Sequence, residues 1–321
     1  MYAHHGGLLC FWRRLLYGQA MTRAFSKPAK SIAEQIALLQ SRGMAVGDVA
    51  VATRALQNIS YYRLRTYWLY FEIDTAREDH QLRPGTSFEQ VLALYEFDRR
   101  LRLLIMDGIE RIEVAARGAW AHHLAMTYGP HGYLNPAHYP NVGKFQRNLK
   151  QLQDEVDRSH DTSIVHYKQT YSSPKLPPIW MASELVSFGL LSKFLSSLGK
   201  RADKKQIARA FGLDDRVFIG FLHHLATVRN ICAHHGRLWN KAFTVTAILP
   251  TAPHDLALSV NPAAPRQLYN TLTIMLHILQ RIDPASEWKD RLLELLDQNP
   301  VGDVAAMGFP VNVSEVAMWQ R

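Results

Sequence analysis

The segment 228–240, VRNICAHHGRLWN, gathers side chains that can handle both a phosphate and a proton. Arg229 and Asn230 are adjacent, and His234 follows Asn230 by four residues. A guanidinium binds a phosphate through two parallel hydrogen bonds and stabilises charge that builds on it. A histidine with a pKa near neutrality takes or gives a proton. These side chains suit cleavage of RNA, whose 2′-hydroxyl supplies the nucleophile, so neither a metal nor another cofactor is required.

A helix must position these side chains, because the residues from 218 to 238 segregate into two faces at 100° per residue. The apolar arc holds Phe218, Phe221, Leu225, Val228, Ile231 and Cys232. The opposite arc holds Arg229, Asn230 and His234, together with His223 and Arg237. Asn230 and His234 are spaced i, i+4, so the amide can orient the imidazole.

The two adjacent histidines are predicted to differ in environment. His235 falls within the apolar arc, which favours packing or a structural hydrogen bond, so His234 is the preferred catalytic residue. Gly236 is a candidate helix end, which leaves the position of Arg237 open. One helix supplies one histidine for an acid–base pair, and a second copy from a symmetric dimer would complete it. The competing interpretation is that this polar face is merely solvated and catalyses no reaction.

Further candidates for RNA contact lie outside the motif. In SYYRLRTYW (60–68), Tyr62 can stack on a base while Arg63 and Arg65 hold the backbone. The same pattern also fits a helix whose aromatic side chains pack in the core and whose arginines are solvated at its edge. Lys204 and Lys205 precede the motif helix and can attract a phosphate backbone or simply be solvated.

Two other patterns favour structural roles. In 96–118 the charges, including Asp98 and Arg102, recur at i, i+3 or i, i+4, which is typical of exposed salt bridges on a helix. Glu110 and Arg117 are candidates for contact with the motif helix. The string HHLA occurs at 122 and 223, but adjacent histidines point about 100° apart on a helix and no familiar zinc spacing accompanies them. No metal site is expected.

The whole chain is predicted to be all-α, because helical periodicity or capping signals recur nearly throughout. A capping box opens the helix at 31–43, and the stretch 85–129 is expected to contain one break or bend. The residues 128–143 form the clearest loop. Helices are further expected at 48–60, 61–73, 144–158, 179–199, 204–213, 214–236, 265–282 and 285–298.

Composition limits the class of protein. The 321 residues are 47% hydrophobic and carry a net charge of +9, which favours a polyanionic partner such as RNA or an acidic membrane surface. Two cysteines need no disulfide framework, and the apolar runs fall short of a membrane span, so a cytoplasmic location is expected. We predict an N-terminal extension at 1–26, with Met21 as an alternative start, one helical domain at 27–300, and a C-terminal tail at 301–321.

The string RNICAHHGRLWN resembles the signature of the Abi family of abortive-infection proteins, of the AbiD/AbiF type, which defend bacteria against phage. The blocks at 27–44, 59–68, 96–118, 128–134 and 176–194 occur in the family's order. The resemblance implies a HEPN-type helical bundle with additional peripheral helices. It also implies an Arg-x(4–6)-His ribonuclease motif, here Arg229, Asn230 and His234, although His235 fits the five-residue spacing.

For activity, the resemblance implies a toxin-like, metal-independent, dimeric endoribonuclease that leaves a 2′,3′-cyclic phosphate and a 5′-hydroxyl. A small non-coding RNA or another antitoxin is the partner that kinship suggests. The alternative within the same family is a HEPN-type module that binds RNA or a protein partner of a defence system without cleaving it.

Overall fold

A computed structural model of the chain describes residues 24, 26–75 and 79–320. These residues form thirteen α-helices and several short 3₁₀ turns, and apart from two isolated bridges they contain no β-structure. The all-α prediction is therefore confirmed. Met21 and nearly all of the predicted N-terminal extension lie outside the described residues.

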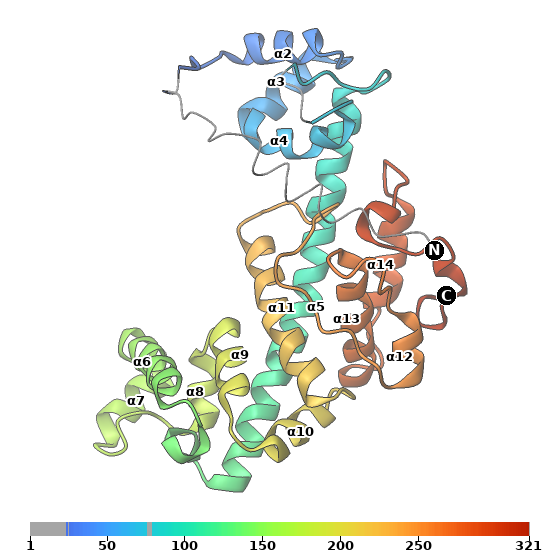
Figure 1. The fold of residues 1–321 in the computed structure, drawn as a ribbon. Helices are drawn as coiled ribbons and strands as arrows, with labels where there is room; N and C mark the ends of the chain where they lie inside the picture. Colours follow the sequence, from blue (N-terminus) through green and yellow to red (C-terminus); the bar gives the residue numbers. More distant parts are fainter. Residues whose placement is uncertain (1–23, 25, 76–78, 321) are drawn as a thin grey trace.

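Figure 1 labels the helices in the order in which they follow one another along the chain. The first half contains α2 (Ile32–Ser41), α3 (Val49–Asn58), α4 (Tyr61–Trp68), α5 (Phe88–Tyr128), α6 (Val142–Arg158) and α7 (Thr162–Thr170). The second half contains α8 (Ile179–Leu185), α9 (Phe188–Ser197), α10 (Arg201–Arg209), α11 (Asp215–Ala233), α12 (His254–Ser259), α13 (Leu268–Ile282) and α14 (Trp288–Asp297).

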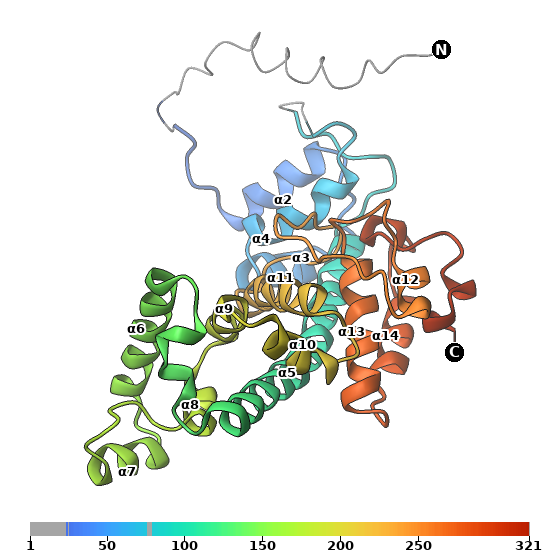
Figure 2. The same ribbon diagram turned by 60° about the horizontal axis from the view of Figure 1, so that its bottom comes forward.

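Helix α5 is the longest of the described helices, and helices from both halves of the chain lie along it (Figures 1 and 2). Its 41 residues correspond to a length of about 60 Å. It begins with a capping box between Ser87 and Gln90 and ends before Gly129, whose φ is +78°. The predicted break within 85–129 was wrong, because α5 finds apolar partners along its whole length, namely α4, α8, α9, α10, α11, α13 and α14.

The predicted helix 179–199 is two helices in the structure. Val186 adopts an extended conformation, with φ −69° and ψ 129°, and ends α8. The hydroxyl of Ser187 then accepts the backbone N–H of Leu190 and caps α9. A serine that caps a new helix inside an apolar run was overlooked, because the hydrophobic spacing continues across it.

The C-terminal residues pack onto the helical body. Trp319 is buried, its ring stacks on Tyr269, and its indole N–H donates to the hydroxyl of Thr273 at 3.2 Å. One continuous cluster of buried apolar side chains extends from Ile36 in α2 to Trp319. None of the helices in the described residues combines the length and the apolar character needed to cross a bilayer.

Candidate functional site

Helix α11 carries the motif and has the two faces that its sequence predicts. Asp214 caps its first turn by accepting the N–H of Arg216. The predicted apolar residues Phe218, Phe221, Leu225, Val228 and Cys232 are buried, and Ile231 is half-buried against the core. On the other face His223 and Asn230 are exposed, and Arg229 is half-buried. The hydrophobic arc therefore orients the polar motif outward.

The end of α11 places both motif histidines on a tight turn. The helix ends at Ala233, and His234 is its C-cap. The N–H of His235 donates to the Cys232 carbonyl at 2.9 Å, and that of Gly236 donates to the Ile231 carbonyl at 2.8 Å. This pair of bonds is the Schellman pattern, with His235 in the left-handed position that glycine usually occupies. Its φ is +58°.

The prediction that His235 packs in the apolar arc was wrong. That prediction assumed a helix that continues through residue 235. The helix instead ends at Ala233, the chain reverses direction there, and both histidines are exposed. Burial therefore gives no reason to prefer His234 over His235. The two imidazoles project from consecutive residues of one turn.

The side chains of Arg229 and Asn230 contact each other. The guanidinium of Arg229 donates to the amide oxygen of Asn230 at 3.4 Å. Within the part of the chain that the structure describes, no side-chain hydrogen bond joins Asn230 to His234, although the His234 N–H donates to the Asn230 carbonyl at 3.0 Å. The contact expected from the i, i+4 spacing is thus a backbone bond, and the amide is free to orient Arg229.

Helix α4 supplies a second set of the predicted residues to this site. The guanidinium of Arg63 donates to the carbonyl of His235 at 2.8 Å. Tyr62, on the adjacent position of α4, is 80% exposed, and Arg65 is half-buried. Arg63 therefore holds the histidine turn against α4, the helix that also carries the exposed ring of Tyr62.

Arg237 has a different place from the one predicted. Because α11 ends at Ala233, Arg237 is not on the helix face. It donates to the carbonyl of Thr66 in α4 at 2.8 Å and to that of Asn240 at 3.4 Å. Burial lowers the pKa of its guanidinium. Arg237 joins the loop after the motif to α4 and is therefore not open to a phosphate in this conformation.

A buried carboxylate that sequence reasoning placed at the surface holds the same loop. Asp98 of α5 has no exposed surface. One of its oxygens accepts the backbone N–H groups of Leu238 and Trp239, at 3.0 and 2.7 Å, and the other accepts the hydroxyl of Tyr67 at 2.8 Å. Arg102 pairs with it one turn further along α5.

The expectation of exposed salt bridges was thus wrong for the Asp98–Arg102 pair. Burial raises the pKa of the Asp98 carboxyl, while Arg102 and the backbone donors of the loop favour its charged form. Of the other candidates on α5, Glu110 is exposed, whereas Arg117 pairs with Glu113 and donates to the carbonyl of Val186 at 2.9 Å. The signal for Asp98 was its place on the core side of a periodic helix, one turn from the apolar residues Leu94 and Leu101.

The lysines of α10 lie at the opposite end of α11 from the motif. Helix α10 packs beside the start of α11, and the 19 residues of α11 span about 27 Å. The ammonium of Lys204 donates to the carbonyl of Ser196 at 2.9 Å, and burial lowers its pKa. Lys205 is exposed. The structure therefore does not bring these two lysines to the motif.

The buried histidine of α11 has a structural role. One ring nitrogen of His224 lies 2.7 Å from the Val245 carbonyl and the other lies 2.8 Å from the hydroxyl of Thr271. Burial lowers its pKa, so the ring is held neutral. No group of three or more potential metal ligands occurs among the described residues.

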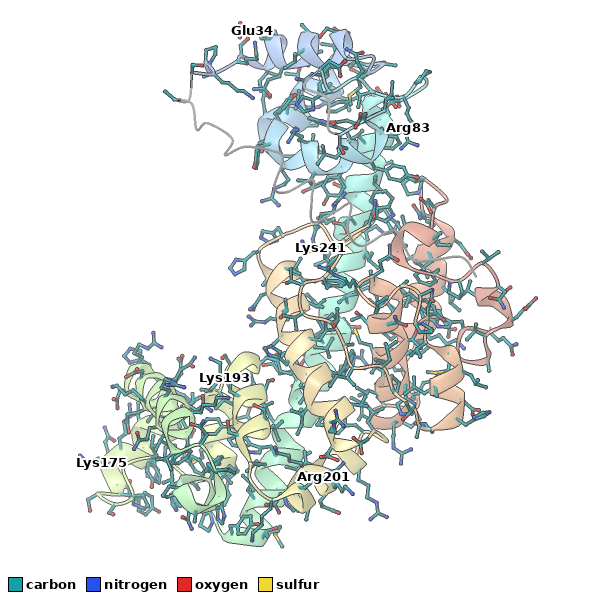
Figure 3. The ribbon with its side chains drawn as sticks, viewed as in Figure 1. Glu34, Arg83, Lys175, Lys193, Arg201 and Lys241 are labelled. Carbon is teal, nitrogen blue, oxygen red and sulfur yellow. The ribbon has the colours of Figure 1, made fainter. Side chains whose placement is uncertain are left out.

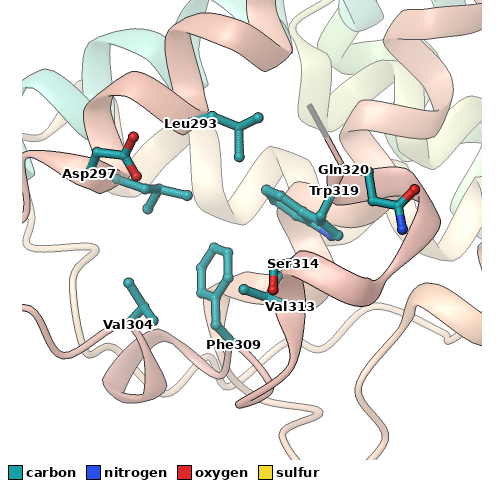
Figure 4. Close-up of a pocket in the computed structure, with 9 residues that line it drawn as sticks. Leu293, Asp297, Val304, Phe309, Val313, Ser314, Trp319 and Gln320 are labelled. Atoms are coloured by element: carbon teal, nitrogen blue, oxygen red, sulfur yellow. The ribbon is translucent and has the colours of Figure 1, made fainter.

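A cavity of about 340 Å³ between α14 and the C-terminal segment is separate from this site (Figure 4). Leu293, Val304, Phe309 and Trp319 give it a mainly apolar wall. None of its lining residues belongs to α4, α11 or the loop after α11. It therefore contributes no group to the chemistry of the motif.

Comparison with known proteins gives one match. A family model described as Abi-like protein matches residues 54–240. This range begins in α3, includes α4, α5, α10 and α11, and ends at Asn240 in the loop that Asp98 holds. No curated protein and no solved structure matches the chain.

Proposed function

The chain belongs to the Abi-like protein family, whose name suggests a role in abortive infection, and we propose that it acts there as a toxin-like endoribonuclease. One observation carries this proposal. Arg229 and Asn230 lie in the last turn of one helix, and His234 and His235 follow on a turn that Arg63 holds, before a loop that Asp98 holds. A phosphate-binding cation and two titratable imidazoles are thus held on a rigid support.

Each residue has a role in a metal-independent cleavage of the HEPN type. The 2′-hydroxyl of RNA attacks the adjacent phosphorus while one imidazole accepts its proton. The bond from phosphorus to the 5′-oxygen breaks, and an imidazolium gives that oxygen a proton. Arg229, oriented by Asn230, stabilises the negative charge that builds on the phosphoryl oxygens. The products are a 2′,3′-cyclic phosphate and a 5′-hydroxyl.

The acid and the base are supplied in one of two ways. His234 and His235 of one chain can share the task, or His234 can act with its copy from a symmetric dimer. The proposal includes this homodimer, a cytoplasmic location, and restraint by a small non-coding RNA or another antitoxin, since a ribonuclease toxin must be held inactive before infection.

The experiment uses purified protein, end-labelled RNA and EDTA, with product ends mapped. Wild-type protein is expected to yield cyclic phosphate ends, and Arg229→Ala or His234→Ala is expected to lower cleavage by at least about 100-fold. Arg216→Ala removes an exposed cation from the first turn of the same helix and is the matched control.

Two outcomes contradict the proposal. Equal RNA binding by wild type and His234→Ala without any cleavage assigns the chain to the binding modules of this family. Cleavage that survives both Arg229→Ala and His234→Ala removes the motif from the reaction.

A further inference from the structure

A second cationic site lies at the other end of α11, where α10, α11 and α13 meet. A cavity of about 510 Å³ is lined by Lys205 and Arg209 of α10 and Arg281 of α13. A neighbouring hollow of about 620 Å³ shares Arg281 and is also lined by His277. In Figure 3, Arg201 lies near the first turn of α11, and Lys241 lies beyond the end of α11 that carries the motif.

These three cations have no partner within the part of the chain that the structure describes. No ion pair or side-chain hydrogen bond there involves Lys205, Arg209 or Arg281. Asp214 and Asp215 also line the cavity, but Arg201 binds them at 3.8 and 3.2 Å. The cavity therefore keeps an excess of positive charge.

The arrangement costs stability in the free protein. Lys205 and Arg209 are spaced i, i+4 on α10, where like charges repel. Arg281 joins them from another helix, and its side chain lies against the turn at Gly212, where an added Cβ would come within 2.8 Å of the Arg281 Cδ. A bound anion would relieve the repulsion among all three.

The lining indicates which part of a polyanion binds. The residues around the cavity include no aromatic ring on which a base would stack. Burial lowers the pKa of His277 in the neighbouring hollow, so its ring adds no charge near neutral pH. The cavity therefore suits phosphates and does not suit bases, which is the character of a contact that positions a strand without reading its sequence.

We propose that the pocket of Lys205, Arg209 and Arg281 binds the phosphate backbone of the RNA that the motif cleaves. This inference rests on the proposed ribonuclease function. Because α11 begins beside the pocket and ends at the motif about 27 Å away, one single strand can contact both. The pocket anchors the strand, and the motif acts at a distance set by the helix.

The test measures binding of a labelled single-stranded RNA of about 20 nucleotides, longer than the site of most single-strand binders. All proteins carry His234→Ala so that RNA stays intact, and fluorescence anisotropy is followed over a salt series. The triple variant Lys205→Gln, Arg209→Gln, Arg281→Gln is expected to bind at least about tenfold more weakly. Its slope of log K against log salt should be shallower by about 2, since each lost phosphate contact in a single strand contributes about 0.7.

A charge-matched control separates the pocket from net charge. Lys144→Gln, Arg147→Gln, Lys175→Gln removes three exposed cations from α6 and from the segment before α8. It should leave both affinity and slope close to those of the parent. Equal weakening by the two triple variants, or no weakening by the pocket variant, overturns the inference.

A free anion is distinguished by a second measurement. If tripolyphosphate raises the melting temperature of the parent but not of the pocket variant, while RNA affinity is the same in both, the pocket holds a small phosphate compound and the inference fails. The parent's failure to bind RNA also overturns it. Failure of the proposed function gives a different result. In that case RNA binding still depends on the pocket, but the wild-type protein produces no cleaved RNA ends.

Discussion

The carboxylate of Asp98 and the backbone N–H of Trp239 lie 2.7 Å apart, although 141 residues separate them in the chain. This bond, with that to Leu238, ties the loop after the histidine turn to the first third of α5, the longest of the described helices. A buried carboxylate that accepts backbone N–H groups is stable only when its charge is matched, and Arg102 supplies that match. The position of the motif therefore depends on an ion pair in α5.

Asp98→Ala is expected to destabilise the fold strongly. It leaves the buried guanidinium of Arg102 without its partner and two backbone N–H groups without an acceptor, so we expect a loss of about 3–5 kcal/mol in the free energy of unfolding. Urea denaturation followed by circular dichroism measures it. Glu110→Ala, an exposed acidic residue of the same helix, should stay within about 0.5 kcal/mol of wild type. Similar losses in the two variants would contradict the role assigned to Asp98.

His235→Gly tests the strained turn and the assignment of the histidines together. Because residue 235 has a φ of +58°, glycine should be accommodated without strain, and the free energy of unfolding should be unchanged or rise by up to about 1 kcal/mol. If His235 takes part in proton transfer, RNA cleavage falls by about 100-fold or more in a protein that is no less stable.

His235→Asn is the companion variant, since asparagine also tolerates the left-handed conformation but does not titrate near neutrality. Cleavage that is retained in both variants returns the catalytic role to His234 alone. A marked loss of stability in His235→Gly would mean that the imidazole, and not the backbone, holds the turn.

Much of this architecture follows from patterns that the sequence displays. The faces of α11 could be predicted because packing decides them and packing follows the 3.6-residue period. The capping box at Ser31 was readable for a similar reason, since its partner Glu34 is only three residues away.

Features set by tertiary contact could not be predicted. The break expected within α5 is absent because seven other helices pack along it, which no local pattern records. The reversal at His234 was missed because histidine occupies a position where glycine usually marks the helix end. Arg281 lies 72 residues beyond Arg209, so its convergence with the basic residues of α10 depends on the fold alone.

Acidification should destabilise the protein through His224. Burial holds the pKa of the folded ring below the ordinary histidine value of about 6.5, so the unfolded chain binds the proton more readily. Stability from the neutral ring is complete above about pH 6.5 and is lost as the pH falls toward the folded pKa, by at most about 1.4 kcal/mol per pH unit. Urea unfolding between pH 7.5 and about 5 measures the slope.

The neighbouring histidine is the control for this pH dependence. His223 is exposed about 100° further round the helix, and its charge is only the smallest cause of the lowered His224 pKa, so His223→Gln should make the slope only slightly shallower. His224→Gln should lower stability at every pH, because the bonds to Val245 and Thr271 are disturbed, yet it should flatten the slope. An unchanged slope in His224→Gln would assign the acid sensitivity to other groups, such as His277.

Two glycines of α5 should respond to alanine with opposite signs. A Cβ at Gly108 would lie 2.7 Å from the Cε of Met275 and 2.9 Å from the indole nitrogen of Trp288, so Gly108→Ala should cost about 1–3 kcal/mol. Gly118 has open space around it, and Gly118→Ala should stabilise the helix by about 0.5–1 kcal/mol. Urea midpoints that move in the same direction would contradict the close contact of α5 with α13 and α14.

Arg63→Ala is expected to loosen the histidine turn without unfolding the protein. It removes the donor to the His235 carbonyl, an exposed bond whose loss should cost about 0.5–1.5 kcal/mol. Since that carbonyl belongs to the residue next to His234, we expect RNA cleavage to fall by more than the stability loss explains.

Arg65→Ala provides the matched comparison on the same helix. Arg65 has the same charge and a similar exposure, but its guanidinium makes no hydrogen bond within the described residues. If the two arginines act only by attracting RNA, both variants should weaken binding equally and share a reduced salt dependence. If Arg63 positions the turn, Arg63→Ala should lower the cleavage rate at saturating RNA, and Arg65→Ala should not. Equal rates at saturation would show that the turn holds its shape without α4.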